Sequence, residues 1–248
     1  MDLIFHLGFQ LWRGAGGRAA MRDANLSGAW NVLAARPARV VLASSAGVYG
    51  AWPDNPLPLR EDHPARPNPE CGYAVDKLEV ERRYLDALPC AALRIAAVLG
   101  PGVDPRVARA TKGYRLGVPA VAGCPQAVQF LDEADAVAAL VAGGWSEFTG
   151  ICNVGTADWL DASAIAALWG TRVVPLPRRV LLAGAEAGRR LGIFPFGADR
   201  AVLLAGPLAL GVQLAPAAIG WRPGRTSVQV LAAARAGRNC AAAPGLAS

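Results

Sequence analysis

Tyr73 and Lys77 are the residues whose types and spacing point most directly to chemistry. They lie four positions apart in GYAVDKLEVE, residues 72–81, where a stretch with the pattern of a helix begins. Side chains at positions i and i+4 project from the same face of a helix. A positive charge beside a phenol favours the phenolate, and it lowers the pKa of the phenol from about 10 toward neutrality. Such a phenol can act as a general acid or base.

Ser45 is the third candidate, and it lies in LASSAGVYG, residues 42–50. A predicted strand over residues 38–45 ends at this serine, and open α/β sheets bind their ligands beyond the carboxyl ends of parallel strands. We predict that the Ser45 hydroxyl hydrogen-bonds a substrate oxygen whose proton Tyr73 moves. A Tyr-x-x-x-Lys pattern alone is more often a solvated helix face, so the interpretation depends on the serines that precede it.

The lysine at position 77 gives modest independent support. Arginine carries almost all the positive charge of this chain, in which Lys77 and Lys112 are the only lysines. A compact ammonium with three donors can contact a ribose hydroxyl and a phenol together, whereas a guanidinium is a planar, permanently charged fork.

The elements that must position these residues alternate between short apolar runs and helix-length stretches. The pattern predicts strands at residues 3–9, 38–45, 90–100 and 150–156, and helices near residues 17–35 and 73–87. This alternation is typical of an α/β fold, with a parallel sheet covered on both faces. A short helix is predicted to begin near Thr226 or Ser227, either of which could cap it.

Composition excludes several classes of protein. A chain of 248 residues, 53% of them apolar, can bury one core with a small appended lobe. The net charge of +6 comes from arginines scattered among acids, so we predict no nucleic-acid partner. The five cysteines form no C-x-x-C pair, which favours reduced thiols and a cytoplasmic location. The uncharged residues 201–220 are interrupted by Gly and Pro, so we expect a buried helix–turn segment, and no membrane partner. No metal site is predicted.

The order of these motifs resembles the extended short-chain dehydrogenases/reductases, in particular the NAD-dependent epimerase/dehydratase group that includes the nucleotide-sugar epimerases. The serine, tyrosine and lysine motifs carry most of the resemblance. Weaker matches are DLIFHLGF (2–9), NLSGAWNVL (25–33), FLDEADAVAAL (130–140), NVGT (153–156) and GWRP (220–223).

The resemblance implies a Rossmann-like sheet, a small C-terminal substrate-binding lobe and a site for hydride transfer with NAD or NADP. Lys77 would bind the nicotinamide ribose and lower the pKa of Tyr73, Tyr73 would exchange a proton with a small-molecule substrate, and Ser45 would orient the reacting oxygen. In an epimerase the hydride leaves, the keto sugar turns over and the hydride returns. The residues expected to line the cofactor groove are His6, Gly8, Asn25 and Ser44, together with Tyr73 and Lys77. For His6 the alternative is a structural histidine at the edge of the core.

The same resemblance divides the chain. Residues 1–157 are expected to form the remaining part of the nucleotide-binding domain, with substrate-loop segments at about 100–130. Residues 158–236 are expected to form mainly the substrate-binding lobe, and residues 237–248 a disordered tail. A homodimer through the helices at 17–35 and 73–87 is also implied.

The start of the sequence departs from the family. No G-x-x-G-x-x-G precedes residue 2, and GAGGRA (14–19) follows the first apolar run by too long a gap for a tight phosphate turn. We interpret those glycines as a surface loop and expect the first half of the sheet to be lacking, on the order of 60 residues. A misassigned start codon, a gene fragment or a degraded paralogue would each account for this. The first strand would then be a bare edge, and NAD binding by this chain alone would be weak or absent.

Two other functions remain open. The family's epimerases often carry an Asn after the position of Arg94, and here IAAV (95–98) supplies only apolar side chains. This difference favours a reductase or dehydrogenase of an apolar, steroid-like carbonyl. The third alternative is a non-catalytic remnant that acts by protein association.

Overall fold

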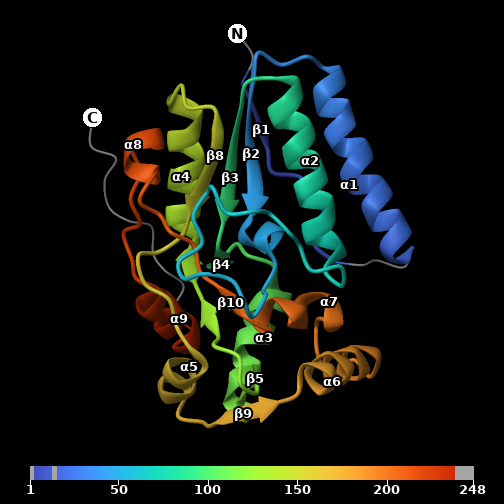
Figure 1. Ribbon diagram of the computed structural model, residues 1–248, viewed down its shortest axis with the longest axis vertical. Helices are drawn as coiled ribbons and strands as arrows, with labels where there is room; N and C mark the ends of the chain where they lie inside the picture. The colour runs from blue at the N-terminus through green and yellow to red at the C-terminus, as the bar shows by residue number, and fades with distance from the viewer. Residues whose placement is uncertain (1–2, 13–15, 238–248) are drawn as a thin grey trace.

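A computed structural model describes residues 3–12 and 16–237 of the chain. Its main feature is a four-stranded parallel sheet with strand order β1-β2-β3-β8 (Figure 1). The strands are β1 (Leu3–His6), β2 (Arg39–Ser45), β3 (Cys90–Ile95) and β8 (Gly150–Val154). The predicted α/β fold with a Rossmann-like parallel sheet is confirmed.

Helices cover both faces of this sheet (Figure 1). One face carries α1 (Gly17–Ala34) and α2 (Gly72–Ala87), and the other carries α4 (Glu133–Trp145) and α8 (Ala215–Ile219). Successive strand side chains point to opposite faces. Val40 and Leu42 therefore pack in the cluster beneath α1 and α2, while Val41 packs in the cluster on the α4 side.

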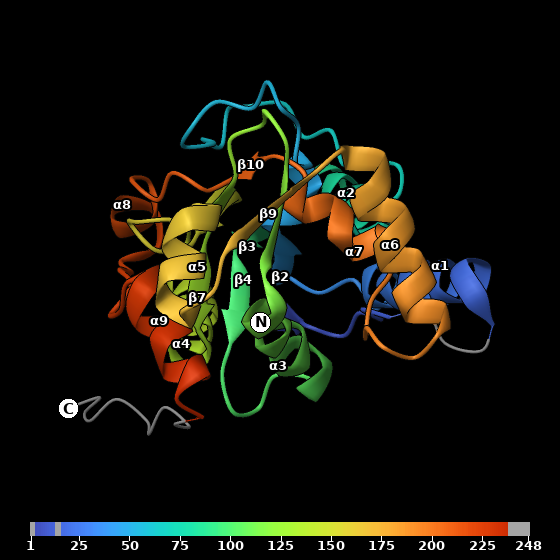
Figure 2. The same cartoon turned by 90° about the horizontal axis from the view of Figure 1, so that it is seen from below.

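A second group of elements lies below the sheet in Figure 1. Figure 2 shows the molecule from below, so that this group faces the viewer. It contains three two-stranded parallel pairs, β4–β7, β5–β9 and β10–β6. The strands are β4 (Ala97–Leu99), β5 (Val118–Val121), β6 (Ala127–Val128), β7 (Phe130–Asp132), β9 (Val173–Leu176) and β10 (Pro207–Leu208). The helices are α3 (Pro105–Lys112), α5 (Ala162–Trp169), α6 (Arg178–Arg190), α7 (Ala198–Ala201) and α9 (Ser227–Arg235). Three 3-10 turns join these parts, namely η1 (Ala46–Tyr49), η2 (Gly113–Leu116) and η3 (Val202–Leu204).

Helix α9 begins as the sequence predicts. The Thr226 hydroxyl accepts a hydrogen bond from the Gln229 backbone N–H at 3.2 Å, and the Gln229 side chain accepts one from the Thr226 N–H at 3.0 Å. This capping box satisfies two donors that a helix start leaves unpaired. The uncharged residues 201–220 are also broken up as expected, into the end of α7, η3, β10 and α8. Among the described residues, no helix is both long and apolar enough to cross a membrane.

The bounds of all four predicted strands differ somewhat in the structure, and two of the strands differ most. The run at 90–100 is two strands, because β4 leaves the main sheet after Ala96 and pairs with β7. Strand β1 ends at His6, and it forms an edge of the described sheet with Leu3 and Phe5 partly exposed. Of the glycine-rich stretch 14–19, residues 14 and 15 lie outside the described residues, and α1 begins at Gly17. In the predicted tail, only Gly237 is among the described residues.

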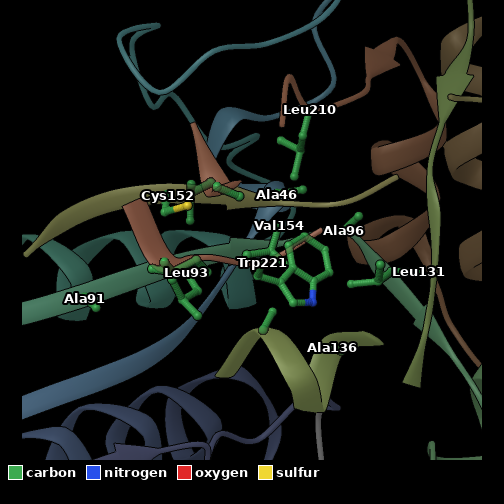
Figure 3. Close-up of a cluster of buried hydrophobic side chains, with 14 of the residues drawn as sticks. Ala46, Ala91, Leu93, Ala96, Leu131, Ala136, Cys152, Val154, Leu210 and Trp221 are labelled. Atoms are coloured by element: carbon green, nitrogen blue, oxygen red, sulfur yellow. The ribbon is translucent and has the colours of Figure 1, made fainter. Parts of the chain in front are cut away.

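Figure 3 shows the core between the main sheet and α4, where Leu93 of β3 lies beside Cys152, Val154 and Trp221. Leu93 is fully buried, whereas Leu116 at the end of η2 is 84% exposed. We predict that Leu93→Ala lowers the free energy of unfolding by about 2–5 kcal/mol, because the truncation leaves a cavity. Urea unfolding measures this, with Leu116→Ala as the matched control. Equal effects of the two substitutions would contradict the placement of Leu93 in the core.

Candidate active site

Ser45 lies at the carboxyl end of β2, where the chain turns into η1. Its backbone is extended, and its Oγ accepts a hydrogen bond from the Gly47 N–H at 3.1 Å, which caps the turn. The same hydroxyl lies close enough to Tyr73 to act on the pKa of its phenol, which it lowers. Ser45 therefore lies at the carboxyl end of the sheet, near the first turn of α2.

Tyr73 is the second residue of α2, and α1 holds the start of that helix in place. Arg18 of α1 donates to the Gly72 carbonyl oxygen at 3.0 Å and to both carboxylate oxygens of Asp76 at 2.5 and 2.8 Å. Asp76 is fully buried, and Arg22 donates to it at 2.9 Å. Gly72 lies so close to Arg18 that a Cβ at this position would be 2.0 Å from the Arg18 Nε. The close contact explains why glycine precedes the tyrosine.

Lys77 lies one turn further along the same face of α2. Its Nζ donates to the Ala43 carbonyl oxygen of β2 at 2.6 Å, and it lies 3.9 Å from the centre of the Phe9 ring. The distance from Nζ to the centre of the Tyr73 ring is 5.8 Å. The structure thus brings Ser45, Tyr73 and Lys77 together, as their spacing predicts, and their catalytic roles stay a prediction.

Burial is the largest effect on the pKa values of both α2 residues. It lowers the pKa of Lys77 to about 7, while the nearby Glu81 acts in the opposite direction. It raises the pKa of Tyr73 above its ordinary value, although Arg200 and the hydrogen bond from Ser45 act to lower it. The sequence predicts a lowered pKa for Tyr73, and the structure differs because desolvation disfavours any charged form.

His6 and Gly8 lie on the segment that leaves β1. The His6 Nε2–H donates to the Gly8 carbonyl oxygen at 3.0 Å, and its Nδ1 lies 2.7 Å from the Tyr84 hydroxyl oxygen. Burial, and then the charge of Lys77, lower the pKa of His6. Both ring nitrogens have protein partners, which fits the structural alternative for this histidine. Gly8 is exposed and leaves open space where a Cβ would stand.

Asn25 and Ser44 make structural contacts within the chain. The Asn25 Oδ1 accepts from the Gln10 N–H at 2.7 Å, so this buried amide ties the segment after β1 to α1. Ser44 is buried and donates to the Glu81 carboxylate at 2.5 Å. Because Ser44 and Ser45 are adjacent on a strand, their side chains point to opposite faces.

A buried polar network supports the end of β2, and sequence patterns did not reveal it. Arg94 of β3 donates to Glu81 of α2 at 2.6 Å, and both side chains are almost fully buried. The Arg94 guanidinium lies 4.5 Å from the centre of the Tyr49 ring. The Tyr49 hydroxyl in turn lies 3.0 Å from Asn153 Oδ1 on β8.

Arg200 of α7 is the other neighbour of the site that the sequence did not indicate. Its guanidinium carbon lies 4.3 Å from the centre of the Tyr73 ring. It also lies 5.4 Å from the centre of the Trp12 ring, and it donates to the Leu11 carbonyl oxygen. No motif surrounds Arg200, so only the folded chain shows that it belongs to the site.

The pKa of Lys77 predicts how stability depends on pH. The folded state prefers the neutral amine down to about pH 7, whereas the amine of an unfolded chain is charged up to about pH 10. Between these values the unfolded state binds more protons, so this residue makes the protein more stable as pH rises, by up to about 1.4 kcal/mol per pH unit. Below pH 7 the contribution is constant.

We therefore expect Lys77→Met to gain the most free energy of unfolding relative to wild type near pH 7. This gain should shrink as the pH rises toward 10. Urea unfolding of both proteins at several pH values measures the difference. The exposed Lys112, the only other lysine, supplies the control Lys112→Met, which should follow wild type. A difference between Lys77→Met and wild type that does not change with pH would contradict the lowered pKa.

Sequence comparison identifies both a family and relatives. A model of the NAD dependent epimerase/dehydratase family matches residues 1–142. The uncharacterized proteins Rv0501 of Mycobacterium tuberculosis (strain ATCC 25618 / H37Rv) and Mb0513 of Mycobacterium bovis (strain ATCC BAA-935 / AF2122/97) are each 33% identical over 175 residues. These matches cover 66% of this chain and 46% of each relative, so the chain spans about half the length of the curated relatives it matches.

Solved structures share the fold over most of the chain. MoeE5 in complex with UDP-glucuronic acid and NAD has a TM-score of 0.64 at 23% identity, covering 94% of this chain and 77% of that one. The Helicobacter pylori ADP-L-glycero-D-manno-heptose-6-epimerase has a TM-score of 0.68 at 17% identity, covering 96% and 72%. The family match extends over more than half of the 248 residues. The chain belongs to the NAD-dependent epimerase/dehydratase family.

Proposed function

We propose that this chain is an NAD(P)-dependent oxidoreductase of the epimerase/dehydratase type, with Ser45, Tyr73 and Lys77 as its catalytic residues. The observation that carries the proposal is their convergence at the carboxyl end of β2. The Ser45 hydroxyl lies close enough to Tyr73 to lower the pKa of its phenol, and the Lys77 Nζ lies 5.8 Å from the centre of the Tyr73 ring. Membership of an NAD-dependent family supports it, as does the NAD in the MoeE5 structure.

Each residue has a separate task in this proposal. Ser45 hydrogen-bonds the substrate oxygen and aligns it with Tyr73, whose phenol gives or takes the proton of that oxygen. The Lys77 amine, which now contacts Ala43 and Phe9, binds the ribose hydroxyls of the nicotinamide nucleotide. The dinucleotide, when bound, supplies the hydride chemistry. Asn25 and His6 hold the segment after β1 along the same side of the site.

For the substrate we propose a nucleotide sugar, because MoeE5 was solved with UDP-glucuronic acid and with UDP-glucose. An apolar carbonyl compound is the second candidate. It is favoured by the side chains of residues 95–98, which are all apolar and follow the carboxyl end of β3. In this proposal residues 158–236 form most of the substrate-binding lobe, and the protein is a cytoplasmic homodimer through α1 and α2.

The first test separates the candidate functions. The purified chain is mixed with NAD or NADP, and binding is followed by thermal shift. Nucleotide sugars are then examined by chromatography for epimers, because an epimerase shows no net redox change. Apolar ketones are examined by NADH or NADPH absorbance. Because weak dinucleotide binding is expected of this chain, turnover is measured at high dinucleotide concentration, and a chain that converts neither substrate class there would instead support the non-catalytic alternative.

The second test addresses the tyrosine. We predict that Tyr73→Phe lowers kcat at least about 100-fold, because it removes the group that moves the proton. Tyr114→Phe is the matched control, because Tyr114 packs against Trp169 in a separate hydrophobic cluster that does not contain Tyr73. Kcat is measured by whichever assay detects turnover. Full activity of Tyr73→Phe would refute the proposed site.

A further inference from the structure

We propose that Arg200, carried by α7, is a positioning residue that supplies the permanent positive charge controlling the ionisation of Tyr73. This inference rests on the proposed function, because it assigns a role to the charge beside the proposed proton donor. It goes beyond that function by adding a second cation to the site, from a part of the chain far from the serine, tyrosine and lysine motifs.

The geometry places Arg200 over the face of the phenol. Its guanidinium carbon lies 4.3 Å from the centre of the Tyr73 ring, while the Lys77 Nζ lies 5.8 Å away. A cation over an aromatic face is attracted to the ring, and it is attracted more strongly once the phenol becomes a phenolate. Arg200 is therefore the nearer of these two cations to the ring.

Arg200 is held in this position by the segment after β1. It donates to the Leu11 carbonyl oxygen, and the Trp12 ring lies 5.4 Å from its guanidinium carbon. The Trp12 ring has a second guanidinium at 4.7 Å, that of Arg106, and its Nε1–H donates to Asp104 at 2.7 Å. These contacts hold the Arg200 guanidinium beside the Trp12 and Tyr73 rings.

The two cations differ in how they respond to pH. Because burial lowers the pKa of Lys77 to about 7, its amine is partly neutral at physiological pH. A guanidinium stays charged throughout this range. Arg200 can therefore keep a positive charge next to Tyr73 while Lys77 is occupied with its other contacts at Ala43 and Phe9.

Among the described residues, the other groups that act on the pKa of Tyr73 carry no positive charge. Ser45 of β2 offers a neutral hydroxyl, and Cys71 before α2 acts to raise the pKa of the phenol. Apolar side chains also pack here: the Phe9 ring lies 5.5 Å from the Tyr73 ring, and Tyr73 belongs to a cluster with Ala74, Leu182, Val202 and Leu203. This apolar cluster joins α2 to α6, α7 and η3, so the charge reaches Tyr73 only while these elements stay packed together.

The ionisation of Tyr73 can be measured without a substrate. The protein is produced with 3,5-difluorotyrosine, whose phenol is more acidic than that of tyrosine, and each phenol is titrated by fluorine NMR. The chain has four tyrosines, and Tyr73→Phe assigns the signal of interest. We compare wild type with Arg200→Gln, with Arg200→Met as a second charge-removing variant that keeps an apolar stem. Arg200→Lys restores the charge, and Arg190→Gln, on the exposed end of α6, is the matched control.

We expect Arg200→Gln and Arg200→Met to shift the Tyr73 titration upward by about one pH unit, which means about tenfold less phenolate at a given pH. Arg200→Lys should restore part of the shift, and Arg190→Gln should leave the titration unchanged. Unshifted signals from the other tyrosines show that each variant is folded. The same Tyr73 titration in wild type and in both charge-removing variants would overturn the inference, as would an equal shift in Arg190→Gln. The proposed function fails separately, if Tyr73→Phe keeps full activity.

Discussion

The buried carboxylate of Glu81 is the contact on which the geometry of the site depends. It accepts hydrogen bonds from Ser44 on β2 and from Arg94 on β3, and so joins α2 to the two central strands. Removing one partner of a buried ion pair commonly costs about 3–5 kcal/mol, because the other charge is left without compensation. The pair therefore makes any shift of α2 along the sheet costly. Tyr73 and Lys77 lie on the same helix, so this contact also helps to set their distance from the end of β2, and the charge of Glu81 acts on the pKa of Lys77.

Two adjacent serines at the end of β2 have different tasks: Ser44 helps to hold α2, and Ser45 is the proposed catalytic residue. Ser44 points toward Glu81 of α2, whereas Ser45, the last residue of β2, lies near Tyr73 in the first turn of the same helix. A slip of one residue in the pairing of β2 with β3 would exchange the two hydroxyls, since every side chain would change face. The observed register pairs Ser44 with Arg94 and Ser45 with Ile95, so each hydroxyl keeps its own surroundings.

Local patterns predicted the elements well and the tertiary contacts poorly. Apolar runs and turn residues located the four strands of the main sheet, and the spacing of Tyr73 and Lys77 located the face of α2. The break at Ala96 was missed because the residues on both sides of it are apolar, and only pairing with β7 shows that β4 has left the sheet. Arg200 and Leu11 are 189 positions apart in sequence, so no local pattern could bring them together. The roles of Ser45, Tyr73 and Lys77 stay a prediction.

The pKa values of Tyr73 and Lys77 are shifted mainly by burial. Burial alone would leave Tyr73 a neutral phenol and Lys77 a largely neutral amine, because desolvation raises the pKa of an acid and lowers that of a base. Proton transfer near neutral pH requires that this penalty be partly offset. A guanidinium keeps its charge even in surroundings where burial lowers the pKa of an amine. The chain places Arg200 over the phenol, so the acidity of Tyr73 depends on contacts between α2, α7 and the segment after β1.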